Sequence, residues 1–280
     1  MVRREGRRLY RDLPWRRTRD AYLVLVSEVM LQQTQVVRVR AYWERWTTAF
    51  PTVDALAAAS TTDVLELWQG LGYHRRALAL KQTAATCADR YGGQVPRCYT
   101  DLLGLPGIGP ATAAGVCVFA YGQPQVYLET NVRTVLLHHF FEGRDRVPDR
   151  ELVPLVEATC DAADPRGWYY ALLDYGSHLK GILPNPSRRS RHHVRQSNFE
   201  GSVRQKRAEL LRLVLACPGR GTDGIAASLN DLERTAGRPA TGIDEVASLL
   251  KALAREGFLA RTPPCDAPPA EAEATWHLAD

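Results

Sequence analysis

The sequence predicts a mainly α-helical protein, in which a helical core is followed by a winged helix at the C-terminus. Apolar residues recur at helical spacing between residues 21 and 183. A Gly- and Pro-rich turn joins two of these segments at residues 104–110. We expect a core over 1–185 (one lobe of 21–118, a second of 1–20 with 119–185), a basic linker over 186–202 and a winged-helix-like domain over 203–280.

The first long helix is expected over residues 21–37, with Leu23, Val26, Met30 and Val37 on its apolar face. Glu28 lies within this segment. A carboxyl group among aliphatic side chains loses hydration, which raises its pKa and enables it to deliver a proton near neutral pH. The alternative is that Glu28 belongs to a polar stripe and faces solvent.

Several amphipathic helices are expected over residues 38–96, interrupted at Gly70 and Gly72. Tyr73, Arg75 and Arg76 follow this break. An aromatic ring beside two guanidinium groups on a turn can enter a base stack and bind phosphates. A buried tyrosine next to solvated charges is an equally good interpretation.

The turn within residues 103–115 is the most distinctive local feature. Gly107 and Gly109 permit backbone angles that other residues resist, and Pro110 suits the first turn of a helix over 110–121. Backbone N–H groups at such a helix start can bind one phosphate, here with Leu105 and Thr112 beside them. An ordinary connection between helices is the alternative.

Glu129 is expected to open a helix that runs to Phe140, where its charge would also favour the helix dipole. Two further helices are expected over 151–183. Beyond the linker we expect helices over 203–216, 224–229 and 242–257, a strand over 258–261, a polar Pro-rich loop and a strand over 275–278. This order indicates a winged helix, which could bind DNA or pack against a partner.

The net charge is +5, and the basic residues are concentrated in two segments. Residues 1–20 contain eight Arg and three acidic residues, and residues 184–209 contain six Arg, one Lys and two Glu. This distribution suits a polyanionic partner, although solvated basic tails would look the same. The six cysteines are scattered without metal-ligand spacing, and no signal peptide or membrane span is apparent, so we expect a cytoplasmic protein without a metal.

Taken together, these residues resemble the helix-hairpin-helix superfamily of DNA glycosylases, and most closely its MutY-type adenine glycosylases. The run Ser27 to Val36 carries most of the resemblance, supported by 13–15, 68–73, the hairpin and 128–132. The resemblance implies that Glu28 protonates the leaving base and that Glu129 faces the sugar. It further implies that Gln32, Gln33, Tyr73 and Asn131 contact the base or fill the stack, and that the hairpin binds phosphate, in some relatives with a monovalent cation.

The sequence departs from the family pattern at four places. Glu129 stands where the family carries Asp, and Ala111 stands where strand-cleaving relatives carry a nucleophilic Lys. Lys180 occupies the first position of the family's iron–sulfur cysteines, and no Cys occurs from 161 to 216, so we expect no cluster. The C-terminus does not resemble the domain that reads oxidised guanine in MutY-type enzymes.

The resemblance implies a monofunctional, monomeric glycosylase acting on double-stranded DNA with a mismatched or damaged base. Adenine is the expected base; uracil, thymine or hypoxanthine is the alternative. A DNA-binding protein without catalysis is the third hypothesis.

Overall fold

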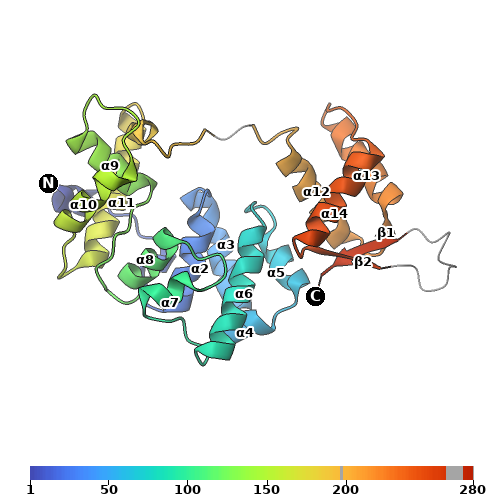
Figure 1. Cartoon of the computed structure of the whole chain (residues 1–280), viewed down its shortest axis with the longest axis horizontal. Coiled ribbons are helices and arrows are strands. Elements are labelled where there is room, and N and C mark those ends of the chain that lie inside the picture. The colour runs from blue at the N-terminus through green and yellow to red at the C-terminus, as the bar shows by residue number, and fades with distance from the viewer. Residues whose placement is uncertain (196–197, 263–273, 280) are drawn as a thin grey trace. The chain divides into compact units, whose positions relative to one another are not determined.

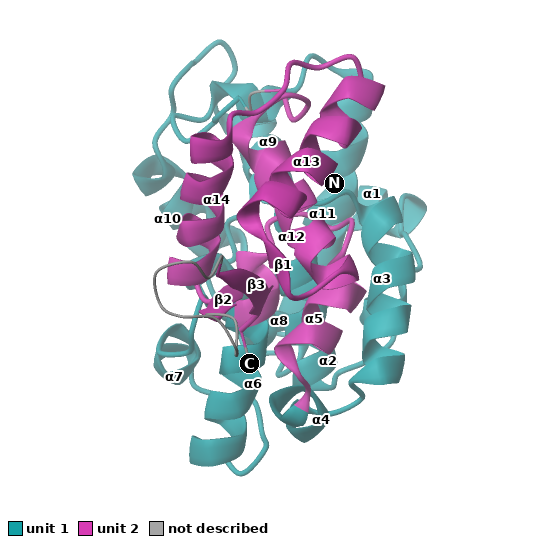
Figure 2. Cartoon of the chain, turned by 90° about the vertical axis from the view of Figure 1, so that its right-hand side faces the viewer, with its two compact units in different colours: residues 1–58, 79–195 teal, residues 59–78, 196–280 magenta. Residues whose placement is uncertain are grey.

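The computed structural model describes residues 1–195, 198–262 and 274–279, and it is built mainly from helices (Figure 1). The polar Pro-rich loop expected before the last strand lies largely outside the described residues, as does Cys265. The chain divides into two compact units, one of residues 1–58 and 79–195 and the other of residues 59–78 and 196–280 (Figure 2). None of the helices within the described ranges is both long and apolar enough to cross a membrane.

The first unit holds nearly all of the predicted core helices. Its elements are α1 (Val2–Arg8), η1 (Pro14–Arg16), α2 (Ala21–Leu31), α3 (Val36–Ala49), α4 (Val53–Ala58), most of α6 (Arg75–Arg90), α7 (Tyr99–Leu103), α8 (Pro110–Phe119), α9 (Thr130–Phe140), α10 (Asp149–Thr159), α11 (Pro165–Ile182) and η2 (Pro186–Arg189).

The single helix predicted over residues 21–37 is wrong. Helix α2 ends at Leu31, and α3 begins at Val36. Gln33 adopts a left-handed backbone with φ of 56°, which an α-helix cannot accommodate. Val37, expected on the apolar face, therefore starts a new helix and is 87% exposed.

Close helix contacts organise the first unit around α8 and α11. Helix α2 packs on α8, and α9 and α1 both pack on α11. A Cβ atom at Gly6 would overlap Ala171, and a Cβ atom at Gly176 would overlap the carbonyl oxygen of Asn131. These two glycines let α1 and the start of α9 approach α11 at backbone distance.

The first half of the stretch expected as a linker is folded onto α9. The guanidinium of Arg189 donates to the carbonyl oxygens of Phe141 and Leu137 at 2.8 and 2.9 Å. Val147 and Ser190 form an isolated β-bridge. Buried backbone acceptors at the end of α9 thus find a partner in a segment that composition alone assigns to a linker.

The second unit combines α5 (Thr61–Trp68) and the first residues of α6 with the C-terminal elements. These are α12 (Val203–Ala216), β1 (Arg220–Gly221), α13 (Thr222–Thr235), α14 (Ile243–Arg255), β2 (Leu259–Thr262) and β3 (Thr275–Leu278). The strands form an antiparallel sheet in the order β1-β3-β2. The sequence did not indicate β1, and α13 is longer than the helix expected over 224–229. The winged-helix interpretation remains a prediction.

Candidate active site

A cavity of about 600 Å³ in the first unit brings several predicted site residues together. Glu28 and Gln33 reach it from α2 and the turn that follows, and Glu129 and Asn131 reach it from the start of α9. Its remaining walls come from the N-terminal segment, the end of α8, Tyr127 and the second half of α11, including Lys180.

Glu28 is held by contacts that its own helix cannot supply. The Tyr127 hydroxyl donates to Glu28 Oε2 over 3.0 Å. A Cβ atom at Gly115 of α8 would overlap the same oxygen. The absence of a side chain at position 115 therefore provides the space in which the carboxyl group lies.

Burial raises the pKa of Glu28 to about 8, although the hydrogen bond from Tyr127 opposes the increase and the charge of Glu129 adds to it. At neutral pH this pKa favours the protonated form of Glu28. A carboxylic acid in this state, facing a cavity, can serve as a general acid.

Glu129 is the N-cap of α9, as its predicted place at the start of that helix requires. Its Oε1 accepts hydrogen bonds from the backbone N–H groups of Asn131 and Val132 at 2.6 and 3.1 Å. Burial raises the pKa of Glu129, and these two bonds, together with the charges of Lys180 and Arg133, counteract the increase. The helix N-terminus thus fixes the carboxyl group at the cavity wall and favours its ionised form.

Asn131 presents a buried amide oxygen whose hydrogen-bonding capacity is unused. Within the described residues, its Oδ1 has no hydrogen-bond partner. Buried acceptors are normally satisfied, so this atom is a natural partner for a substrate group or a water molecule. Its position in the cavity agrees with the predicted role of Asn131 as a pocket residue.

Aromatic side chains form much of the remaining cavity wall. Phe119 and Tyr170 stack with ring centroids 4.6 Å apart, and Tyr127 meets the edge of Phe119 at 5.1 Å. Arg16 lies over the Tyr170 ring and forms a buried ion pair of 2.7 Å with Asp174. Such a wall suits a flat heterocycle, and the buried ion pair fixes the N-terminal segment against α11.

Gln32 and Gln33 occupy the turn after α2, but their side chains lie in different surroundings. Gln32 Nε2 donates to Thr112 Oγ1 at 2.9 Å, which links this turn to the first turn of α8. Gln33 lines the cavity in its left-handed conformation. Strained backbone of this kind occurs often at functional sites.

The hairpin between α7 and α8 has the predicted left-handed turn at Gly107 but not at Gly109, whose backbone is extended with φ of −90°. Gly107 has φ of 71°, and a Cβ atom there would lie 2.6 Å from that of Ala79. Thr83 fixes the turn by donating to the Pro106 carbonyl at 2.9 Å. A Cβ atom at Gly109, the N-cap of α8, would meet nothing within 4 Å, so the helix start is open to a ligand. Leu105 is buried, and only its backbone can serve a phosphate.

Tyr73, Arg75 and Arg76 lie in the second unit. Tyr73 is 42% exposed with φ of 51°, whereas Arg75 pairs with Glu256 at 2.9 Å. Arg76, which the sequence places beside Tyr73 as a candidate phosphate-binding group, is half-buried. It stacks on the Trp68 and Tyr73 rings and donates to the Gly72 carbonyl at 3.0 Å. Tyr73 is thus presented outward on a turn that Arg76 supports.

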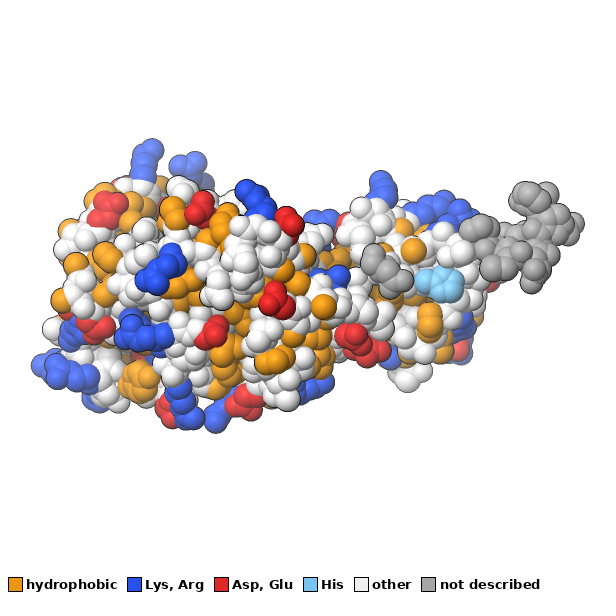
Figure 3. Space-filling model, turned by 90° about the horizontal axis from the view of Figure 1, so that it is seen from below, with side chains coloured by type: hydrophobic (Ala, Val, Ile, Leu, Met, Phe, Trp, Pro, Cys, Tyr) orange, Lys and Arg blue, Asp and Glu red, His pale blue; other side chains and the backbone are white. Residues whose placement is uncertain are grey.

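Much of the charge in the basic N-terminal segment is used within the fold. Six of its eight arginines form ion pairs: Arg3, Arg4, Arg8, Arg11, Arg16 and Arg17. On the face drawn in Figure 3, basic and acidic side chains are interspersed. Arg3, Arg11 and Arg16 pair with acidic residues of 161–174 and so attach the segment to the first unit, whereas the other three pairs lie within the segment and their arginines are mostly exposed.

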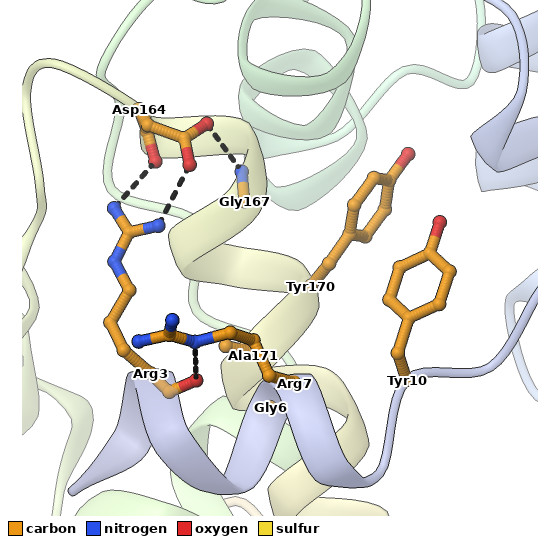
Figure 4. A pocket seen from close by; sticks show the side chains of 8 residues that line it. All are labelled: Arg3, Gly6, Arg7, Tyr10, Asp164, Gly167, Tyr170 and Ala171. Carbon is orange, nitrogen blue, oxygen red and sulfur yellow. Dashed lines mark hydrogen bonds and ion pairs between the residues drawn. The ribbon is translucent and has the colours of Figure 1, made fainter.

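A second hollow, between α1 and α11, has a different character (Figure 4). Arg3 bridges Asp164 and Asp161 at its rim, and Arg7 donates to the Arg3 carbonyl at 3.4 Å. Tyr10 and Tyr170 stand side by side at its other end. Its carboxylate, Asp164, is paired with Arg3, so the lining of this hollow offers no two carboxyl groups comparable to Glu28 and Glu129.

The residues present do not fit an iron–sulfur cluster. Lys180 lies in the cavity wall, and the free cysteines of the described chain are distributed over residues 87, 98, 117, 160 and 217. Across the described residues, no three His, Cys, Asp or Glu side chains are grouped so that they could hold a metal ion. The absence of a cluster remains a prediction from the sequence.

Residues 26–154 match the family described as HhH-GPD superfamily base excision DNA repair protein. This segment contains both carboxylates of the cavity and the hairpin. Residues 26–154 are therefore similar to the helix-hairpin-helix DNA glycosylases, as the motifs of the chain predict.

The sequences to which the chain is similar include adenine DNA glycosylases. The chain is 49% identical over 127 residues to the adenine DNA glycosylase of Mycolicibacterium smegmatis. The aligned region covers 45% of this chain and 43% of the relative. The chain is 38% identical over 179 residues to the human adenine DNA glycosylase, covering 60% of this chain and 33% of the relative. The chain thus spans less than half the length of these two relatives.

Solved structures show the same fold. A thermostable thymine-DNA glycosylase superimposes with a TM-score of 0.56 at 24% identity, covering 63% of this chain and 82% of that one. An endonuclease III in a non-covalent DNA complex gives a TM-score of 0.53 at 19% identity, covering 61% and 80%. Both support the helix-hairpin-helix glycosylase fold for the helical core.

Proposed function

We propose that this protein is a monofunctional DNA glycosylase of base excision repair, which hydrolyses the N-glycosidic bond of a flipped-out adenine. One observation carries the proposal: Glu28 and Glu129 share one cavity, in which burial raises the pKa of Glu28 to about 8. The adenine DNA glycosylases to which the chain is similar support adenine as the base.

The chemistry follows from the charges that develop as the bond breaks. Glu28 donates its proton to the leaving base, which departs as a neutral molecule, while the sugar acquires oxocarbenium character. Glu129, ionised and fixed by its cap bonds, stabilises this positive charge. A water molecule then adds to the anomeric carbon and gives its proton to the carboxylate that Glu28 has become, while the buried Oδ1 of Asn131 is a suitable hydrogen-bond acceptor for that water.

The base reaches this cavity only after it leaves the duplex stack. We infer that Tyr73 and Gln33, both in strained conformations, fill or wedge the vacated space. The open start of α8 would bind one phosphate through its backbone N–H groups, with or without a monovalent cation. Ala111 offers no amine in that helix, so strand cleavage through it is not expected.

The substrate is double-stranded DNA with a mismatched or damaged base, and we expect the protein to act as a monomer. The helices α12 to α14 and the antiparallel sheet support a winged helix as a second DNA-binding element.

The basic segment before α12 can be tested by substituting the exposed Arg188 and Arg191 with Ala. Duplex binding should then depend less on salt: the slope of the logarithm of the binding constant against the logarithm of the salt concentration should fall by about one unit for each phosphate that the variant no longer binds.

The decisive experiment incubates the protein with duplexes that carry adenine opposite guanine, oxidised guanine or cytosine, and with uracil, thymine and hypoxanthine mispairs. Alkali then converts each abasic site into a strand break. Breaks at adenine that need alkali, and that Glu28→Gln abolishes, would support the proposal. Release of another base would transfer the mechanism to that substrate, and duplex binding without release would leave only a DNA-binding function.

A further inference from the structure

Lys180 is a charged residue that the mechanism above does not use. It lines the same cavity as Glu28 and Glu129. It lies four residues after Gly176 on α11, so the two residues share one face of that helix. Gly176 meets the backbone of Asn131 at the first turn of α9. The same face of α11 therefore presents Lys180 beside the N-terminus of α9, where Glu129 is the cap.

We propose that Lys180 is a positioning residue that keeps Glu129 ionised while the neighbouring Glu28 stays protonated. This inference rests on the proposed function, because that reaction needs the two carboxyl groups in opposite protonation states. Lys180 acts through Glu129 and has no role as a nucleophile.

The physical need arises from the burial of two carboxyl groups in one cavity. Burial penalises the charge on each group, and each charge penalises the other. Without further charges, the helix cap alone would have to keep Glu129 ionised. The half-buried ammonium group of Lys180 in the same cavity supplies a further countercharge.

The other cations of this region are engaged elsewhere. Arg133 of α9 pairs with Asp149 at 2.6 Å, and Arg11 and Arg16 of the N-terminal segment share the carboxylate of Asp174. In the described part of the chain, Lys180 has no ion pair of this kind.

The electrostatic coupling has the sign that the proposal requires. Burial lowers the pKa of Lys180, and the charge of Glu129 opposes that decrease; burial raises the pKa of Glu129, and the charge of Lys180 opposes that increase. Arg133 acts on Glu129 in the same direction as Lys180, while Arg11 lowers the pKa of Lys180. Lys180 therefore acts on the carboxyl group that must carry the charge during catalysis.

The test compares single-turnover base release from the best duplex across pH for the wild type, Lys180→Met and Lys180→Arg. We expect Lys180→Met to shift the acid limb of the profile upward by about one pH unit or more, because Glu129 loses its countercharge. Lys180→Arg should restore most of the wild-type profile. The exposed Lys251, which does not line the cavity, provides the control Lys251→Met, which should leave the profile unchanged.

A merely structural role for Lys180 predicts something else. Lys180→Met would then lower the rate by the same factor at every pH, with the acid limb unmoved, and that result would overturn the proposal. A covalent DNA adduct trapped by borohydride in the wild type and absent in Lys180→Arg would also overturn it, because Lys180 would then be a nucleophile.

A second measurement needs no substrate. The carboxyl carbon of Glu129 can be titrated by NMR in protein labelled at Glu and assigned by its loss in Glu129→Gln. A higher pKa of Glu129 in Lys180→Met supports the proposal, and an unchanged one refutes it. Because this readout is independent of base release, it still decides the question if the panel of duplexes disproves the glycosylase function.

Discussion

The hydroxyl of Tyr127 donates a hydrogen bond of 3.0 Å to Oε2 of Glu28, a residue 99 positions earlier in the chain. The bond favours the ionised carboxylate and so opposes the effect of burial on the pKa of Glu28. The pKa of about 8 is the balance of these effects. The protein thereby stabilises an acid that is strong enough to release its proton and weak enough to hold one at neutral pH.

The alkaline limb of base release should report this acid directly. The rate should fall as pH rises through about 8, because Glu28 loses the proton that the leaving base needs. Tyr127→Phe should move this limb to higher pH, since the carboxylate loses a donor. Tyr121→Phe removes a phenol outside the cavity and should leave the limb in place. If Tyr127→Phe left the alkaline limb unmoved, the limb would not report the ionisation of Glu28.

The length of the side chain at position 129 can be tested separately from its charge. Asp is a strong N-cap, so Glu129→Asp should keep α9 capped and retain partial base release. Glu129→Gln should reduce release nearly as much as Glu28→Gln, because the sugar cation loses its countercharge. Glu129→Ala should also destabilise the protein by about 1 kcal/mol. Thermal unfolding and single-turnover rates distinguish these effects, and full activity in Glu129→Gln would contradict the assigned role.

Gly115 should be more important for activity than a helical glycine usually is. Gly115→Ala places a Cβ atom where Glu28 Oε2 lies, so the carboxyl group must move and base release should fall sharply. Gly181→Ala is the matched control, because a Cβ atom there meets nothing within 4 Å. It should preserve activity and stabilise α11 by about 0.5–1 kcal/mol. Equal activity in both variants would show that Glu28 does not depend on this space.

Tyr73 combines an exposed ring with a strained backbone, which suits a wedge. Tyr73→Gly should relieve the strain and keep the unfolding free energy within about 1 kcal/mol of the wild type, while base release falls because the stack is no longer filled. Arg146→Gly relieves a similar φ of 54° at another exposed position and should leave release unchanged. Normal release by Tyr73→Gly would remove Tyr73 from the DNA-binding residues.

Purified protein should be colourless and free of iron. The reason is chemical, since a cluster requires several closely placed thiolates and residues 161–216 contain no cysteine. Metal analysis and the visible absorption spectrum provide the measurement. Near-stoichiometric iron with a cluster absorption band would contradict the prediction.

The sequence predicts those site residues whose role depends on local structure. Gly107 and Pro110 define a turn by their own backbone preferences, and Glu129 caps the helix that follows it directly. Glu28 could be placed by its motif, although sequence alone left open whether it faces solvent. The turn at Gly107 and the cap at Glu129 follow the sequence because few distant residues contribute to them, whereas the surroundings of Glu28 depend on Tyr127 and Gly115. The roles of these residues remain predictions.

Residues whose role depends on distant contacts escaped prediction. Tyr127 stands in a short apolar stretch, and nothing near it indicates a bond to Glu28. Gly115 lies among alanines in α8. The only sequence feature that marks it is its presence inside a helix, where glycine is usually unfavourable. The turn after Leu31 was missed because the apolar pattern continues through it, and only the backbone of Gln33 reveals the interruption.

Residues 59–78 interrupt the first unit in sequence but belong to the second by their contacts. In the second unit, Arg75 pairs with Glu256, and the Tyr73 hydroxyl accepts a hydrogen bond of 3.3 Å from Arg204. The C-terminal part of this unit therefore depends on a segment that lies more than 100 residues earlier in the chain. Cutting the chain after residue 195 would place residues 59–78 and the C-terminal elements that they contact in different fragments. These fragments could remain associated without a peptide bond between them. Fragments expressed alone would each lack part of a folding unit, so a domain boundary drawn along the sequence would give misleading measurements of both pieces.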